Sequence, residues 1–262
     1  MTEPLRHAEQ VMGTVVSFDI RDPGTGDRGT AVEAGLRRAV AWLHQVDRVF
    51  STYRPDSQIS RLGRGELRPA DCDPEVAEVL ALGEAAERDG RGLFSIRAGG
   101  TLDPSAVVKG WAVERASEIL RAAGSLRHSV NGGGDIQTAG EPEPGRPWRL
   151  GVAHPLHPGG YATVVQGRDL ALATSGTAER GEHILDPRTG RPAGGGLASV
   201  SVVGRSLTRV DIAATTAFAL GAAGRGWLEE QPGLEGFAVL SDGRAWWTSG
   251  FGAHGRLPSG TG

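Results

Sequence analysis

The stretch RHSVNGGGDIQTA (residues 127–139) decides the fold class. Side chains alternate with a period of two on either side of three glycines, a pattern typical of two strands joined by a tight turn. The same period returns, between Gly, Pro and Asp turns, at residues 148–152, 162–166, 170–174, 197–203, 236–240 and 245–249. A run of adjacent strands of this kind predicts a mainly antiparallel sheet.

Helical patterns surround these strands. Four segments are expected to be helices, because apolar residues recur in them every three or four positions or a capping residue stands at their start. They are residues 32–50, 73–88, 105–124 and 210–220. Ser105 is expected to cap the third of these helices. Single strands are expected at 10–20 and at 94–97. Because strands and helices do not alternate regularly, the sequence predicts an α+β fold, with helices packed on the sheet.

The length of 262 residues permits one two-lobed domain or two small domains. No convincing linker divides the chain, since residues 141–147 have the composition of a loop and residues 257–262 that of a tail. We therefore expect a single domain over residues 1–262.

Charge and hydropathy narrow the class of partner. The net charge of −3 leaves no excess of positive charge for a nucleic acid backbone, so we expect no nucleic acid partner. No apolar run has membrane-spanning length, and residues 1–10 contain no cysteine for a lipid anchor. We therefore expect a cytoplasmic protein without an integral membrane segment.

The composition marks four residues as candidates for a site. Of 28 basic residues, Lys109 alone is lysine. Asn131 is the single asparagine, Met12 is the single methionine after the initiator, and Tyr53 is one of two tyrosines. A lysine carries a compact ammonium group on a flexible stem, whereas an arginine carries a planar guanidinium group. We therefore expect Lys109 at a site where an arginine could not replace it.

Asp211 and Thr215 form the first chemical motif. They lie four residues apart on a predicted helix, so their oxygens project from one face, one turn apart. A carboxylate and a hydroxyl suit a hard cation such as Mg²⁺, which completes its shell with water and phosphate oxygens. The alternative is that Asp211 caps the helix and Thr215 packs in the core.

Three other segments carry weaker signals. In residues 103–110 a helix start offers amide groups to an anion and Lys109 adds a positive charge; the alternative is an exposed lysine. The glycines of 131–135 permit close approach to a ligand, or simply make a hairpin. His183, beside a turn, binds a phosphate or base, or is an ordinary loop residue.

Taken together, these segments resemble the ApbE family in chain order. The matching motifs are MGT (12–14), STYRPDS (51–57), DPSAVVKG (103–110), NGGGD (131–135), TSG (174–176), HILDPRTG (183–190) and DIAAT (211–215). Departures are modest: Trp111 stands where the family commonly has tyrosine, Glu114 where it has aspartate, and Gly132 where it has a small apolar residue.

The resemblance implies a binding site for FAD between two lobes, with Mg²⁺ held by Asp211, Thr215 and the main-chain carbonyl of Ala106. By position, it also implies that FAD contacts come from Met12, Tyr53, Phe94, Ser95, Ile96, Asp103, Lys109, His183 and Ile184.

The implied activity is that of an FAD:protein FMN transferase, which moves the FMN half of FAD onto a Thr or Ser hydroxyl of an acceptor protein and releases AMP. Asp211, or alternatively His183, would accept the hydroxyl proton. Two rival functions use the same pocket. One is Mg²⁺-dependent hydrolysis of FAD to FMN and AMP, and the other is a flavin carrier without catalysis.

Overall fold

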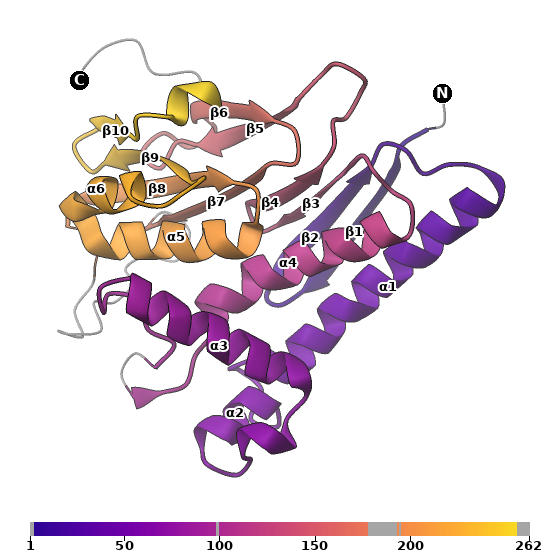
Figure 1. Cartoon of the computed structure of the whole chain (residues 1–262), viewed down its shortest axis with the longest axis horizontal. Helices are drawn as coiled ribbons and strands as arrows, with labels where there is room; N and C mark the ends of the chain where they lie inside the picture. Colours follow the sequence, from indigo (N-terminus) through magenta and orange to yellow (C-terminus); the bar gives the residue numbers. More distant parts are fainter. Residues whose placement is uncertain (1–2, 98–99, 178–192, 194, 256–262) are drawn as a thin grey trace.

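A computed structural model describes residues 3–97, 100–177, 193 and 195–255. Within these residues, eight strands form one sheet (Figure 1). Their spatial order is β1 (Leu5–Val11), β2 (Thr14–Ile20), β3 (His128–Gly132), β4 (Asp135–Ala139), β7 (Ala171–Gly176), β8 (Leu197–Gly204), β9 (Glu235–Leu240) and β10 (Ala245–Trp247). β5 (Trp148–Ala153) and β6 (Tyr161–Gly167) form a separate hairpin. All paired neighbours are antiparallel, which confirms the predicted α+β fold.

Helices cover one face of the sheet, and the β5–β6 hairpin covers part of the other. α4 (Ser105–Ala122) packs on β3 and β4, whereas α5 (Leu207–Leu220) packs on β7 and β8. From the hairpin, Leu150 and Val165 join a hydrophobic cluster with Val203 and Phe237 of the sheet. Every residue of β8 is buried, as expected for a strand that is covered on both faces.

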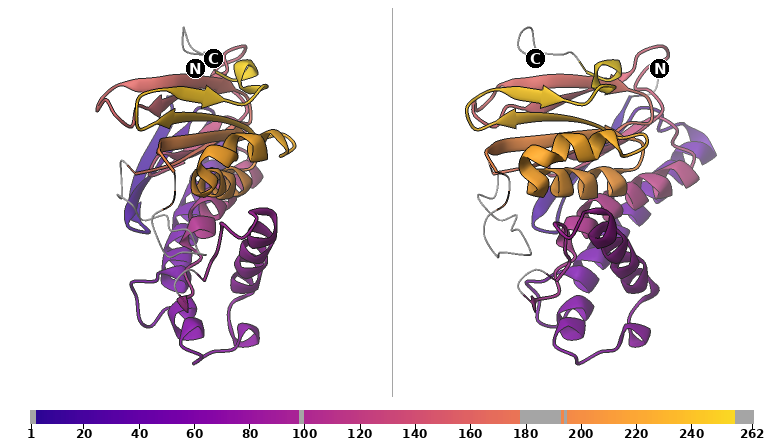
Figure 2. Two further views of the ribbon diagram at one scale, coloured as in Figure 1. Left: turned by 90° about the vertical axis from the view of Figure 1, so that its left-hand side faces the viewer. Right: turned by 60° about the vertical axis from the view of Figure 1, so that its left-hand side comes forward.

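Three further helices, α1 (Gly26–Phe50), α2 (Gln58–Gly63) and α3 (Pro74–Asp89), build the second lobe. α1 lies along α4, where the Trp42 indole donates to the Ala112 carbonyl at 3.1 Å and the Phe50 ring packs 5.6 Å from that of Trp111. α2 and α3 extend beyond the sheet, as both views in Figure 2 show. The molecule therefore has two lobes, as the family resemblance implies.

The predicted single strand over residues 10–20 is wrong, because the chain reverses within it. β1 and β2 form a hairpin whose turn is Met12 and Gly13, with φ of 54° and 69°. Both turn residues have positive φ, as in a type I′ turn, whose twist matches the right-handed twist of the strands. Glycine is typical of this conformation and methionine is not, so only one of the two turn residues indicated a turn in the sequence.

The predicted strand at residues 94–97 is also wrong, since this segment is a loop held by side chains. Glu87 Oε1 accepts hydrogen bonds from the Ser95 hydroxyl at 2.7 Å and from the Ile96 amide at 3.1 Å. The carbonyl of Ile96 accepts from the amide of Asp103 at 2.8 Å. These bonds satisfy the main chain without a neighbouring strand.

Helix starts show smaller differences. Pro104, not Ser105, is the N-cap of α4, and the side chain of Asp103 accepts from the Ser105 amide at 3.0 Å. Asp73 is the N-cap of α3 as predicted, although its side chain makes no capping bond. Two helices of six residues, α2 and α6 (Gly224–Glu229), are too short to show a period in the sequence and were not predicted.

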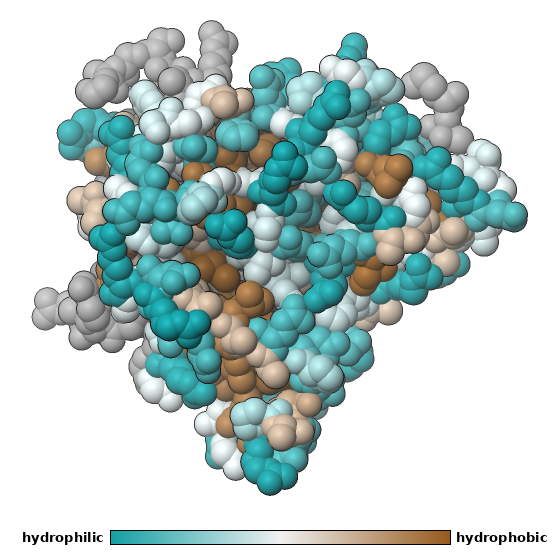
Figure 3. All heavy atoms as spheres, viewed as in Figure 1, coloured by the Kyte–Doolittle hydropathy of each residue, from teal (hydrophilic) through white to brown (hydrophobic). Residues whose placement is uncertain are grey.

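None of the helices in the described residues is long and apolar enough to cross a membrane. The face in Figure 3 is largely hydrophilic, with scattered hydrophobic side chains and a strip of them that runs over α3 between α5 and α2. The predicted loop at 141–147 joins β4 to β5, whereas the predicted tail at 257–262 lies outside the described residues.

Candidate functional site

Tight turns bring separate parts of the chain to one end of the sheet. Met12 and Gly13 join β1 to β2, and Gly133 and Gly134 join β3 to β4. Both turns lie at the same end because β2 pairs antiparallel with β3, and the Gly133 amide donates to the Val15 carbonyl at 3.3 Å. The C-terminal end of β7 lies there as well, because β7 runs antiparallel to β4.

α4 and α5 cross closely and run in opposite directions beside the sheet. Glu114 Oε2 on α4 accepts from the Thr208 amide at 2.8 Å. One turn earlier on α4, the Gly110 amide donates to Asp211 Oδ2 at 3.0 Å. Only glycine permits this approach, since a β-carbon at position 110 would lie 2.8 Å from the β-carbon of Asp211.

This crossing places the three predicted metal ligands at the same end of the helix pair. Ala106 lies one turn before Gly110 on α4, and Thr215 lies one turn after Asp211 on α5. Asp211 is buried, with 4% of its surface exposed, and Thr215 is half-buried. The Thr215 hydroxyl lies 3.1 Å from that of Ser175 at the end of β7.

The oxygen atoms of these residues fit Mg²⁺. The Gly110 amide, one turn along α4 from the Ala106 carbonyl, donates to Asp211. A carbonyl oxygen has two lone pairs, so that of Ala106 has capacity for a further partner. One carboxylate, a hydroxyl and a carbonyl make a donor set that Mg²⁺ accepts, since it usually takes only one or two protein carboxylates.

Lys109 pairs with Asp135 at this same end. Asp135 begins β4, and its side chain is only 2% exposed, whereas that of Lys109 is 28% exposed. The other carboxylate oxygen of Asp135 accepts from the Thr174 amide at 3.1 Å. Because Lys109 adjoins Gly110, its ammonium group provides a positive charge close to the helix crossing.

The loop between α3 and α4 carries four of the predicted FAD contacts. A β-carbon at Gly90, where the loop begins, would lie 3.2 Å from the methyl group of Thr216 on α5. Phe94 and Ile96 are buried in the core, at 3% and 2% exposure, whereas Asp103 is exposed. A ligand would therefore meet the main chain of this loop rather than these two apolar side chains.

The other predicted contacts are less closely grouped. Met12 packs partly against the core from its turn at the site end. Tyr53 follows α1 and is 96% exposed, so its ring stands in solvent. His183 and Ile184, with the motif around them, lie outside the described residues.

Two residues at this end, Asp135 and Ser175, were not predicted as part of the site. They belong to the motifs NGGGD and TSG, in which neither residue was given a role. The sequence marked Lys109 by its rarity, and a lysine that the fold half-buries requires an anionic partner. Nothing in the local sequence indicates which carboxylate that partner is.

A second polar cluster is buried between α4 and β3. His128 is 0% exposed, with its ring nitrogens 2.8 Å from the Ser117 hydroxyl and 3.0 Å from the Ser125 hydroxyl, and Ser125 donates to Asp22 at 3.1 Å. Burial, and next the charge of Arg121, lowers the pKa of His128 from 6.5 to about 4. Because no substrate reaches it, this cluster holds the fold together and is not a catalytic triad.

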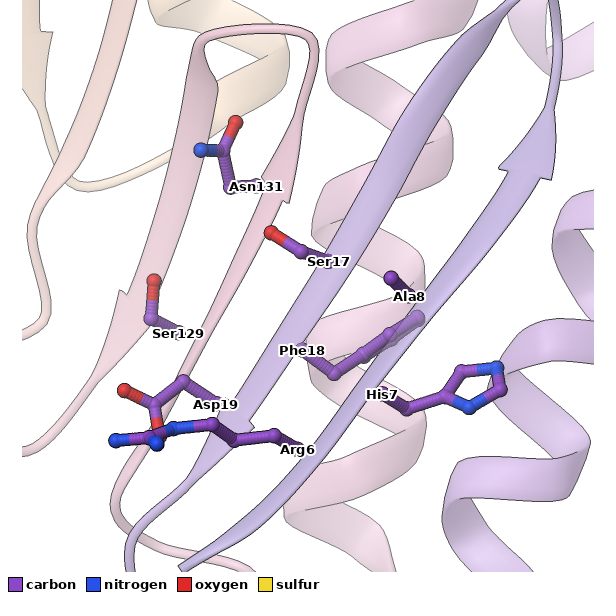
Figure 4. A pocket seen from close by; sticks show the side chains of 8 residues that line it. All are labelled: Arg6, His7, Ala8, Ser17, Phe18, Asp19, Ser129 and Asn131. Carbon is purple, nitrogen blue, oxygen red and sulfur yellow. The ribbon is translucent and has the colours of Figure 1, made fainter.

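A pocket of about 460 Å³ lies on the sheet face that points away from the helices (Figure 4). The side chains that line it come from β1, β2 and β3 and include Arg6, Ser17, Asp19, Ser129 and Asn131. Asn131 and Asp135 project to opposite faces, because Asp135 pairs with Gly132, the residue after Asn131. This pocket is therefore separate from the helix crossing.

A family model and several curated relatives match this chain. Residues 12–101 and 97–238 match the model of the ApbE family. An FAD:protein FMN transferase of Vibrio cholerae is 32% identical over 129 residues, which are 46% of this chain and 39% of that relative. One of Rhodobacter capsulatus is 31% identical over 183 residues, 67% of this chain and 32% of the relative. The chain thus spans less than half the length of these relatives.

Solved structures agree on the fold. The flavin transferase ApbE from Vibrio cholerae superimposes with a TM-score of 0.79 at 22% identity, over 96% of this chain and 99% of the other. An ApbE protein from Thermotoga maritima gives a TM-score of 0.80 at 21% identity, over 97% and 100% of the two chains. Since the family model matches most of the sequence, the chain belongs to the ApbE family.

Proposed function

We propose that this protein transfers the FMN half of FAD to a Thr or Ser hydroxyl of an acceptor protein and releases AMP. Its family and the names of its relatives support this activity. The observation that carries the proposal is the hydrogen bond between the Gly110 amide and Asp211, because it brings the implied metal ligands and Lys109 to one end of two helices.

Asp211, Thr215 and the carbonyl of Ala106 would hold Mg²⁺. Bound there, Mg²⁺ would supply Lewis-acid stabilisation of the charge on the diphosphate of FAD. Asp211 is oriented for this role by the Gly110 amide, and Thr215 by the hydroxyl of Ser175. A buried carboxylate held by a main-chain donor has little freedom to move, which favours one ligand geometry.

FAD would lie along the site end of the sheet, where Lys109 attracts its diphosphate. Met12, Tyr53, Asp103 and the main chain of residues 94–96 are proposed as further contacts, together with His183 and Ile184. The ring of Tyr53 is exposed, so it is available to a flat aromatic ligand.

The proposed reaction is a single displacement at phosphorus. The acceptor oxygen forms a bond to the phosphorus of the FMN half, and the bond from that phosphorus to the AMP oxygen breaks, so AMP leaves with the electron pair. The hydroxyl proton passes to Asp211 or, alternatively, to His183. Holding both reactants in line converts an encounter in solution into a reaction within one complex.

The mass of an acceptor protein tests this proposal. After incubation with FAD and Mg²⁺, transfer adds one FMN to the acceptor, and a chelator should prevent it. Free FMN and AMP with an unmodified acceptor would instead indicate hydrolysis. FAD binding that is indifferent to chelator, without any reaction, would indicate a carrier.

Two expectations from the sequence stay predictions. We propose that the whole chain acts as one domain, which limited proteolysis of the FAD-bound protein would test. We also propose a cytoplasmic location and cytoplasmic acceptors, which cell fractionation would test.

A further inference from the structure

Asp135 is a buried carboxylate to which the proposed reaction assigns no role. It begins β4 directly after the glycine turn, and its side chain is 2% exposed. Its strand partner Gly132 lies beneath α4, where a β-carbon would come within 2.6 Å of the side chain of Val113. The absence of a side chain at Gly132 therefore lets α4 approach the sheet beside Asp135.

The two carboxylate oxygens of Asp135 connect α4 to β7 at the site end. One pairs with the ammonium group of Lys109 on α4, and the other accepts from the Thr174 amide on β7 at 3.1 Å. The next residue of β7, Ser175, contacts the proposed metal ligand Thr215 at 3.1 Å. One carboxylate thus ties the lysine to the strand that supports Thr215.

α4 has a similar tie at its other end, which provides an internal comparison. Asp169 accepts from the Gly140 amide at 2.9 Å and from Arg121 on α4 at 3.0 Å. This pair is exposed, with 52% of the Arg121 side chain and 39% of the Asp169 side chain accessible. It joins the same helix to the same pair of strands, but it lies away from the site end.

We propose that Asp135 is a positioning residue that holds the ammonium group of Lys109 in place for the diphosphate of FAD. This inference rests on the proposed function. A lysine has a flexible four-carbon stem, so its charge is spread over many positions unless an anion holds it. A buried carboxylate that is itself fixed by a main-chain amide can do so, because it has little freedom to move.

The test measures FAD binding by flavin fluorescence in the presence of Mg²⁺. Asp135→Asn keeps an oxygen for the Thr174 amide but removes the charge that holds Lys109. We expect Kd for FAD to rise about tenfold, as for one loosened charged contact. In a Lys109→Met background the same change should have no further effect. Asp169→Asn, the matched control, should leave Kd unchanged.

The outcomes separate this inference from the proposed function. If the unmodified protein binds no FAD, the proposed function fails. If it binds FAD but Asp135→Asn leaves Kd unchanged, the positioning role is refuted. A lower Kd would also refute it, since Asp135 would then compete with the diphosphate for Lys109. Equal losses with and without Lys109 would also refute it.

A second variant covers the possibility that Asp135→Asn does not fold. Asp135→Glu keeps the charge but moves the carboxylate by one methylene group. Positioning predicts a Kd about tenfold higher for this variant as well, because the place of the ammonium group changes. An unchanged Kd would show that only the charge matters and would overturn the proposal.

Discussion

The buried His128 makes the stability of this protein depend on pH. Its pKa is lowered from 6.5 to about 4 because the ring is fully buried, next to Ser117 and Ser125. The unfolded chain therefore binds a proton on this side chain near pH 6.5, and the folded chain only near pH 4. Stability from this group is fully present above pH 6.5 and is lost as pH falls from 6.5 towards 4.

The difference between the two pKa values sets the size of the effect. At about 1.4 kcal/mol for each pH unit, the complete loss is about 3 kcal/mol, of which about 2 kcal/mol is lost by pH 5. Urea unfolding, followed by tryptophan fluorescence at pH 7.5 and pH 5, measures it. The variant His128→Asn carries no titrating group at this position. Between pH 7.5 and pH 5 its free energy of unfolding should therefore fall by about 2 kcal/mol less than that of the unmodified protein.

The control is Val15→Asn, because the side chain of Val15 is 50% exposed and neither residue titrates, so the pH dependence should stay unchanged. Carboxylates titrate in all three proteins, so their contribution cancels in the comparison. Equal pH dependence in the unmodified protein and in His128→Asn would refute the claim that a buried neutral histidine causes the loss.

Three further predictions concern α4 and α5. Asp211→Asn should lower FMN transfer at least about a hundredfold while circular dichroism stays unchanged, and full activity by mass measurement would disprove its role. Gly110→Ala should cost about 1–3 kcal/mol in urea unfolding, because the added carbon meets Asp211 at 2.8 Å. The control is Gly226→Ala, since no atom lies within 4 Å of the added carbon, and its stability should be unchanged or up to about 1 kcal/mol higher. The same change in stability for both variants would contradict the close crossing of α4 and α5. Glu114→Gln should cost about 1–2 kcal/mol, because a carboxylate accepts from the first turn of α5, and an unchanged unfolding midpoint would contradict this.

Local patterns were sufficient for much of the fold. The period of two around the glycines of NGGGD predicted β3, β4 and their turn, and the later strands followed from the same pattern. The first hairpin was missed because alternation continues through Met12 and Gly13. The loop at 94–97 was mistaken for a strand because its hydrogen bonds go to Glu87, a partner that no local period reveals.

Local patterns likewise predicted part of the candidate site and missed the rest. The spacing of Asp211 and Thr215 predicted that they share one face of a helix, and the rarity of lysine marked Lys109. Neither observation predicted Asp135 as the partner of Lys109, nor Ser175 beside Thr215. Those contacts join side chains on different secondary structure elements, so they depend on how the elements pack.

The sequence by itself determined the antiparallel strands, the helices that cover them and the spacing of a carboxylate and a hydroxyl along α5. These features depend on contacts between near neighbours in the chain, which hydrophobic period and turn chemistry encode. Only the tertiary structure decided that α4 and α5 cross at Gly110, and that Lys109 meets Asp135 there. A contact of this kind depends on the distance between two packed helices and the sheet beneath them, and no single segment of the chain specifies that distance.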